Sequence, residues 1–128
     1  MIYLDSSVAL AVLFTEMRAP PREFWRAGFV ASRLLEYEVM NRVHAQRLDA
    51  AKVAAARQLI ESVELVELTP AVLARALAPF PLRVRTLDAL HLATMVYLRD
   101  QQQDIVLATY DERLASAAAA LGFAPARL

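Results

Sequence analysis

Short apolar runs alternate with longer stretches of helical periodicity along the chain, and this alternation constrains the fold more than any other feature. Between the runs, apolar residues recur every three or four positions, for example within 34–43 and 53–63, as on one face of a helix. Strands that alternate with helices form a mostly parallel sheet covered on both faces. We therefore predict a three-layer α/β/α fold with a sheet of about five strands. The strands are expected at Ile2–Leu4, Phe29–Ala31, Leu65–Leu68 and Ile105–Ala108, with an edge strand within 123–128.

Length and composition indicate one globular domain spanning residues 1–128. Hydrophobic residues make up 58% of the chain, enough for an ordinary core. Only two glycines are present, which argues against a glycine-rich phosphate loop and a turn-rich all-β fold. The absence of cysteine excludes disulfides, thiolate zinc sites and cysteine nucleophiles.

The sequence gives no indication of a membrane protein. Asp5 interrupts the first apolar run, and no basic stretch precedes that run, so a signal peptide is not expected. The charge-free stretch 114–126 is shorter than the ~20 apolar residues that a transmembrane helix needs. We expect a soluble, cytoplasmic protein.

Charge alone does not identify a nucleic-acid binder. Acidic and basic residues balance at 14 each, whereas counterion release often favours a basic excess in such proteins. Lys52 is the single lysine, and arginine suits bidentate phosphate contacts better than lysine does. A GC-rich genome would give the same bias, so both interpretations stay open.

Four acidic residues are predicted to converge at one edge of the sheet. Asp5 and Asp111 follow apolar strands directly, Glu38 lies two turns into the helix that begins near Ser32, and Asp88 lies in the first turn of the helix that begins near Thr86. Ligands of such folds bind beyond the carboxyl ends of the strands. Each acid also has an ordinary structural interpretation: an aspartate can cap a helix or complement its dipole, and Glu38 can be a solvated helix residue.

Clustered carboxylates repel one another, and a hard divalent cation removes that conflict. Mg²⁺ and Mn²⁺ favour oxygen ligands and retain several waters. Zinc is less suited here, because the chain has no cysteine and only His44 and His91 as imidazoles.

Several neighbours of the acids have a possible supporting role. Ser6 and Thr109 lie close in sequence to strand-end aspartates and are candidates for hydrogen bonds to them. His91 follows Asp88 by one helical turn; it could touch the site, although a histidine that packs the helix is the favoured interpretation. Arg83 and Arg85 precede the Asp88 helix and either contact phosphate or belong to a solvated loop.

Four segments, in this order, resemble the PIN domain and specifically its VapC-type toxins. The third segment is the strongest match, with an acid followed one turn later by a histidine. In the second, the family's acid lies six residues after the serine, which selects Glu38. The segments are Tyr3-Leu4-Asp5-Ser6-Ser7, Ser32-Arg33-Leu34-Leu35-Glu36-Tyr37-Glu38-Val39, Arg85-Thr86-Leu87-Asp88-Ala89-Leu90-His91-Leu92-Ala93 and Thr109-Tyr110-Asp111-Glu112-Arg113-Leu114.

This resemblance implies a Mg²⁺- or Mn²⁺-dependent endoribonuclease. By analogy, Asp5 and Asp88 would be direct metal ligands, and Glu38 and Asp111 would hold coordinated waters or a second ion. The metal would activate water for attack on an RNA phosphodiester. The resemblance also implies a homodimer and a small antitoxin protein that covers the acidic pocket.

Two other classes of protein were weighed. A phospho-receiver domain shares the sheet, a strand-end aspartate and Mg²⁺, but it normally has paired acids after the first strand and a lysine after a late one. Here serines follow Asp5, and the late strand leads into Thr109-Tyr110-Asp111. A non-catalytic scaffold of the same fold would have lost acids, and metal-dependent cleavage of RNA separates it from a nuclease.

Overall fold

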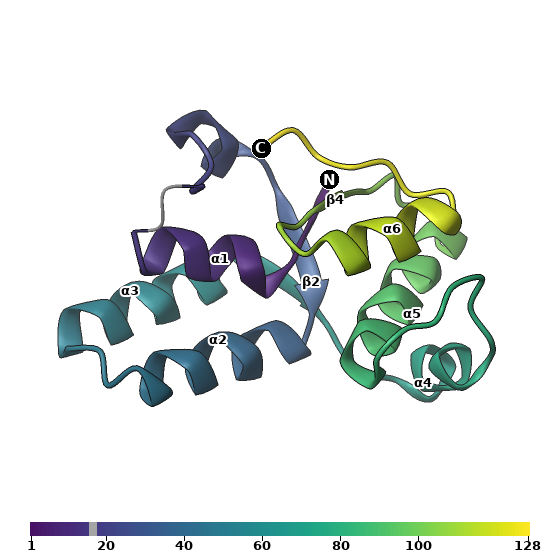
Figure 1. Cartoon of the computed structure of the whole chain (residues 1–128), viewed down its shortest axis with the longest axis horizontal. Helices are drawn as coiled ribbons and strands as arrows, with labels where there is room; N and C mark the ends of the chain where they lie inside the picture. Colours follow the sequence, from purple (N-terminus) through teal and green to yellow (C-terminus); the bar gives the residue numbers. More distant parts are fainter. Residues whose placement is uncertain (16–17) are drawn as a thin grey trace.

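A parallel four-stranded sheet with strand order β3-β2-β1-β4 forms the centre of the molecule in the computed structural model (Figure 1), which describes residues 1–15 and 18–128. β1 is a central strand, paired with β2 on one side and β4 on the other. The predicted three-layer parallel fold is confirmed. The elements are β1 Ile2–Leu4, α1 Ser6–Leu13, the 3₁₀ helix η1 Arg22–Arg26, β2 Phe29–Ser32, α2 Leu34–Ala45, α3 Ala50–Glu61, β3 Val63–Val66, α4 Pro70–Leu77, α5 Thr86–Asp100, β4 Val106–Ala108 and α6 Glu112–Ala120.

Helices cover both faces of the sheet and define two apolar cores. Successive residues of a strand point to opposite faces, so Leu4 packs into the core beneath α1–α3, and Tyr3 packs into the core beneath α5 and α6. β2 divides in the same way, with Phe29 on the first face and Val30 on the second. Figure 1 shows the two groups of helices on either side of the strands, with α4 outside α5.

The sheet has four strands where about five were predicted. The segment expected to form an edge strand within 123–128 contributes only an isolated bridge between Leu107 and Pro125. β3 begins two residues earlier than predicted, because Val63 and Leu65 alternate toward the core whereas Glu64 is exposed. Leu68 lies outside the strand, immediately before the Thr69 cap of α4.

Side chains before several of the helices accept a backbone N–H of the first turn. These caps include Asp5 for α1, Asp49 for α3 and Thr69 for α4. α5 begins at Thr86, and the preceding residue Arg85 makes no side-chain cap bond. Glu16 and Met17, between α1 and η1, lie outside the described residues.

The strand order places a crevice at the carboxyl ends of β1 and β4. From β1 the chain proceeds outward to β2 and β3, and it returns to the other side of β1 as β4. The crevice at such a reversal is where ligands bind in open α/β sheets. Leu4 pairs with Ala108, so the next residues of both strands, Asp5 and Thr109, leave the sheet side by side. Within the described residues, no helix is both long and apolar enough to cross a membrane.

Candidate active site

Asp5 is fixed in the crevice by hydrogen bonds that all end on one of its carboxylate oxygens. Oδ2 accepts from the Ser7 hydroxyl at 2.5 Å, from the Ser7 amide at 3.3 Å and from the Thr109 hydroxyl at 2.7 Å. The Asp5 backbone N–H donates to the carbonyl of Ala108. Asp5 is 6% exposed, so its carboxylate is almost fully buried at the carboxyl end of β1, and the described side-chain hydrogen bonds engage one of its oxygens.

Ser7 and Thr109 join the ends of β1 and β4 into one network. The Ser7 hydroxyl accepts from the Tyr110 amide at 2.9 Å, and the Thr109 hydroxyl accepts from the Asp111 amide at the same distance. Asp111 then caps α6, with Oδ1 accepting from the amides of Arg113 and Leu114. The network therefore sets the positions of Asp5 and Asp111 relative to each other.

Glu38 extends from α2 toward α5, where His91 holds it. His91 Nε2 lies 2.6 Å from Glu38 Oε1, and Nδ1 lies 2.7 Å from the hydroxyl of Tyr3. The Tyr3 oxygen also accepts from the Ser32 amide at 3.1 Å. Because His91 is 1% exposed and Tyr3 is fully buried, this chain of bonds is rigid, and it ties Glu38 to the central strand of the sheet.

The first turn of α2 is anchored at the end of β2. The Ser32 hydroxyl accepts from the Leu34 amide at 3.2 Å, which satisfies one of the free donors of the helix. Arg33 binds Glu36 at 3.1 Å and also Glu67, and these contacts raise the pKa of Arg33 and lower that of Glu67. α2 therefore leaves β2 in a fixed direction, and Glu38 reaches the crevice from its second turn.

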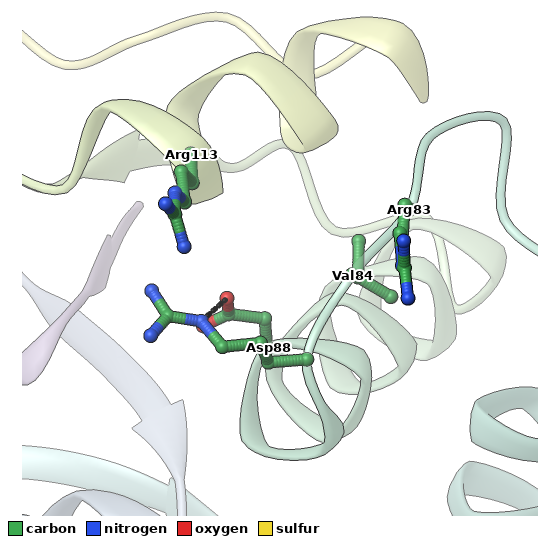
Figure 2. Close-up of a pocket in the computed structure, with 5 residues that line it drawn as sticks. Arg83, Val84, Asp88 and Arg113 are labelled. Atoms are coloured by element: carbon green, nitrogen blue, oxygen red, sulfur yellow. Dashed lines mark ion pairs between the residues drawn. The ribbon is translucent and has the colours of Figure 1, made fainter.

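Asp88 lies in the first turn of α5, where the charges of the strand-end acids Asp111 and Asp5 act on it. Burial, followed by the charges of Asp111 and Asp5, raises the pKa of Asp88, and Arg85 only partly offsets this. Arg85 Nε lies 3.9 Å from Asp88 Oδ2. Asp88 also lines a pocket of about 370 Å³ with Arg83, Val84, Arg85 and Arg113 (Figure 2).

Three of the acids also affect the pKa of His91. Burial alone would lower the pKa of His91, but the hydrogen bond and the charge of Glu38, together with the charges of Asp5 and Asp88, raise it. Burial raises the pKa of Tyr3, and the charges of Asp5 and Glu38 raise it further. All four predicted acids therefore act electrostatically on one small region of the protein.

The donor set suits a hard divalent cation. Among the described residues, the hydrogen bonds of Asp5, Glu38 and Asp111 each use a single carboxylate oxygen, which leaves Oδ1, Oε2 and Oδ2 respectively without one. No group of three or more acidic or histidine side chains in the described part of the chain is close enough to enclose a metal by itself. Mg²⁺ is commonly held by one or two carboxylates and by waters, so the site fits such an ion without a closed protein cage.

The charges of the four predicted acids act on one another or on His91, and the structure changes some of their expected neighbours. The hydroxyl that binds Asp5 belongs to Ser7 rather than to Ser6, whereas Thr109 makes the expected contact. Tyr3 contacts His91, and Arg113 lines the pocket that contains Asp88; neither was singled out from the sequence. Tyr3 looked like an ordinary core residue of a strand, and Arg113 differs from other exposed arginines only by its place two residues after Asp111.

The parallel sheet, the reversal at β1 and the acidic crevice define a class of protein. The chain belongs to the PIN-domain family, whose pattern it matches over residues 2–120.

Its relatives within this family include VapC proteins of Mycobacterium tuberculosis. It is 30% identical to ribonuclease VapC47, over 98% of this chain and 96% of the relative. It is 39% identical to ribonuclease VapC46, over 96% and 94%. The crystal structure of VapC20, described as a sarcin-ricin loop cleaving toxin, superposes with a TM-score of 0.71 over the full length of both chains; at 17% identity this likeness establishes the fold.

Proposed function

We propose that this protein is a Mg²⁺- or Mn²⁺-dependent endoribonuclease and the toxin of a toxin–antitoxin pair. The observation that carries the proposal is the electrostatic influence of the acids on one another: the charges of Asp111 and Asp5 act on Asp88, and the charge of Glu38 acts on His91. In addition, the described hydrogen bonds leave one carboxylate oxygen of Asp5, Glu38 and Asp111 without a partner. The relatives named ribonuclease VapC47 and VapC46, which match nearly the whole chain, support the same activity.

The residues of the chain have distinct roles in this proposal. Asp5 and Asp88 would hold the metal directly, and Glu38 and Asp111 would orient waters around it. A bound divalent ion supplies an acidified water and neutralises charge on the phosphodiester. Ser7, Thr109 and His91 are positioning residues, since each binds an acid without facing substrate. Arg85, beside Asp88, would contact the phosphate that is cleaved.

Cleavage of RNA by the purified protein tests the proposal. A pool of structured RNA is incubated with the protein in Mn²⁺, in Mg²⁺ or in EDTA, and the new 5′ ends are mapped. We expect cleavage in either metal, no cleavage in EDTA, and a loss of at least about a hundredfold in Asp111→Asn. The matched control is Asp104→Asn, which neutralises an exposed aspartate in the loop before β4.

A protein that leaves RNA intact in both metals, once freed of any bound partner, would be a scaffold of the same fold instead. Cleavage that persists unchanged in EDTA or in Asp111→Asn would contradict the proposed metal site. The expected loss of cleavage in Asp111→Asn counts as support only when the variant is folded, which circular dichroism checks.

The proposed partners are RNA, a second copy of the chain and a small antitoxin that covers the acidic crevice. Co-expression with the neighbouring open reading frame tests the antitoxin: a cognate antitoxin co-purifies and suppresses cleavage. Light scattering of the purified protein tests the homodimer, because it gives the mass in solution directly.

A further inference from the structure

Beyond the acidic crevice, a second feature of the surface stands out: a groove lined by Arg83 and Arg113. The two residues line the pocket of about 370 Å³ that contains Asp88, and they also line an adjoining pocket of about 350 Å³ with Leu82, Glu112 and Ser116. The groove therefore begins at Asp88 and leads away from it, between the segment before α5 and the first turns of α6. Figure 2 shows Arg113 extending from α6 toward Asp88, and Arg83 beside Val84 on the facing segment.

Basic side chains outnumber acidic ones in the lining of this groove, with Arg83, Arg85 and Arg113 against Asp88 and Glu112. Among the described residues, neither Arg83 nor Arg113 forms an ion pair, whereas Arg85 lies near Asp88 and Arg33 is paired with two glutamates. Both side chains are exposed, so they are free to reorient toward a ligand. In a chain with no net charge, two unpaired guanidinium groups facing one groove make a local site for anions.

We propose that Arg83 and Arg113 bind the phosphates of the RNA strand on one side of the cleaved bond. The inference rests on the proposed ribonuclease function, because the groove starts where the cleaved phosphate would lie. Guanidinium groups are suited to phosphate oxygens, and contacts with phosphates position a strand without reading its sequence. The groove thus fixes the register of the strand over the acids, while Asp88 and its neighbours carry out the chemistry.

Binding of RNA in EDTA tests this assignment independently of cleavage. Fluorescence anisotropy of a labelled single-stranded RNA of mixed sequence is measured across a range of salt, and a gel confirms that the RNA stays intact. Each phosphate contact on a single strand contributes about 0.7 to the slope of log K against log salt. We expect Arg83→Gln or Arg113→Gln to lower the slope by about 0.7, and the double variant by about 1.4, which corresponds to about 25-fold weaker binding near about 0.1 M salt.

Two matched variants separate phosphate binding from a general loss of charge or of fold. Arg57→Gln removes an exposed arginine from α3, on the other side of the sheet, and should leave the slope near the wild-type value. Arg113→Lys keeps the charge and should restore most of the slope. In cleavage assays the double variant should raise KM with little change in kcat, since the acids are untouched.

The inference is overturned if Arg83→Gln and Arg113→Gln behave like Arg57→Gln, or if the wild-type protein does not bind the RNA at low salt. It is also overturned if binding of poly-glutamate depends equally on the two arginines, because the groove would then be a site for acidic protein segments. If the arginine variants lower the salt slope but the wild-type protein never cleaves RNA, the phosphate-binding groove is supported and the ribonuclease function is rejected.

Discussion

His91 Nε2 lies 2.6 Å from a carboxylate oxygen of Glu38, and this contact joins α5 to α2 across the carboxyl edge of the sheet. The other ring nitrogen faces the Tyr3 hydroxyl at 2.7 Å, so the imidazole connects the crevice to the buried core. In either charge state an N–H at Nε2 can donate to Glu38. His91 therefore acts through Glu38, although it lies on the same helix as Asp88, one turn further along.

Removal of this imidazole should weaken catalysis through the position of Glu38. We expect His91→Leu to lower cleavage by about 10- to 100-fold, the usual cost of losing a partner that orients a metal-site residue. The variant should also lose about 1–3 kcal/mol of stability, because the buried Tyr3 hydroxyl loses its contact with His91 Nδ1 and keeps its contact with the Ser32 amide. Cleavage rates and chemical denaturation measure the two effects separately.

His91→Gln is the matched control, since its amide offers an N–H donor near the position of Nε2. It should recover most of the cleavage lost in His91→Leu. If His91→Leu cleaves RNA at the wild-type rate, the contact is only structural, and the positioning role is wrong.

Asp88 is expected to destabilise the protein when no metal is bound. Burial and the charges of Asp111 and Asp5 raise the pKa of Asp88, so the folded state binds its proton more tightly than the unfolded state does. The ionised carboxylate therefore destabilises the fold fully above the folded-state pKa. This destabilisation decreases as the pH falls through that pKa, and it disappears below the unfolded-state pKa.

In EDTA, Asp88→Asn should consequently have a higher Tm than the wild-type protein at neutral pH. The difference should vanish below the ordinary pKa of an aspartate, about 3.9. Scanning calorimetry across this range of pH checks both statements. A lower Tm for Asp88→Asn at neutral pH would mean that the carboxylate is stabilised by contacts other than those with its charged neighbours.

Much of the fold was predictable because its signals are local. The apolar runs of β1, β2 and β4 have strand length, and Asp49 and Thr69-Pro70 are strong signals for helix starts. The predicted bounds of β3 were two residues too late. β3 is an edge strand in which buried and exposed residues alternate, and this alternation is a weaker signal than a continuous apolar run. The last predicted strand makes only one described bridge, between Leu107 and Pro125, in which Leu107 donates to Ala124 and accepts from Ala126.

The positions of the proposed acids follow from local signals too, whereas most of their hydrogen-bond partners, Thr109 excepted, do not. Asp5 and Asp111 are found from the ends of strands alone. The choice between Ser6 and Ser7 depends on which hydroxyl turns back from the first turn of α1, and that choice needs coordinates. The partnership of His91 with Glu38 links residues 53 positions apart, and no spacing within one helix predicts it.

Ser7 should matter for stability far more than its neighbour Ser6. The Ser7 hydroxyl donates to Asp5, lies 3.3 Å from the Thr109 hydroxyl and accepts from the Tyr110 amide. Ser7→Ala removes all three contacts from a partly buried position, and we expect a loss of about 1–3 kcal/mol. Ser6→Ala, for which no side-chain hydrogen bond is described in the structure, should change stability by less than about 0.5 kcal/mol. Equal losses in urea denaturation for the two variants would refute the network at the ends of β1 and β4.

Divalent metal should stabilise the folded protein through the acidic crevice. A ligand that binds only the folded state adds about 2.7 kcal/mol at a hundredfold excess over its Kd, so Mn²⁺ should raise the Tm in a concentration-dependent way. Asp5→Asn should abolish most of this rise, because the proposed site would lose a buried anionic oxygen. Asp104→Asn, at an exposed loop position, should respond to Mn²⁺ like the wild-type protein. A Tm that Mn²⁺ raises equally in all three proteins would locate the ion elsewhere on the surface and remove the physical basis for metal-assisted cleavage in this crevice.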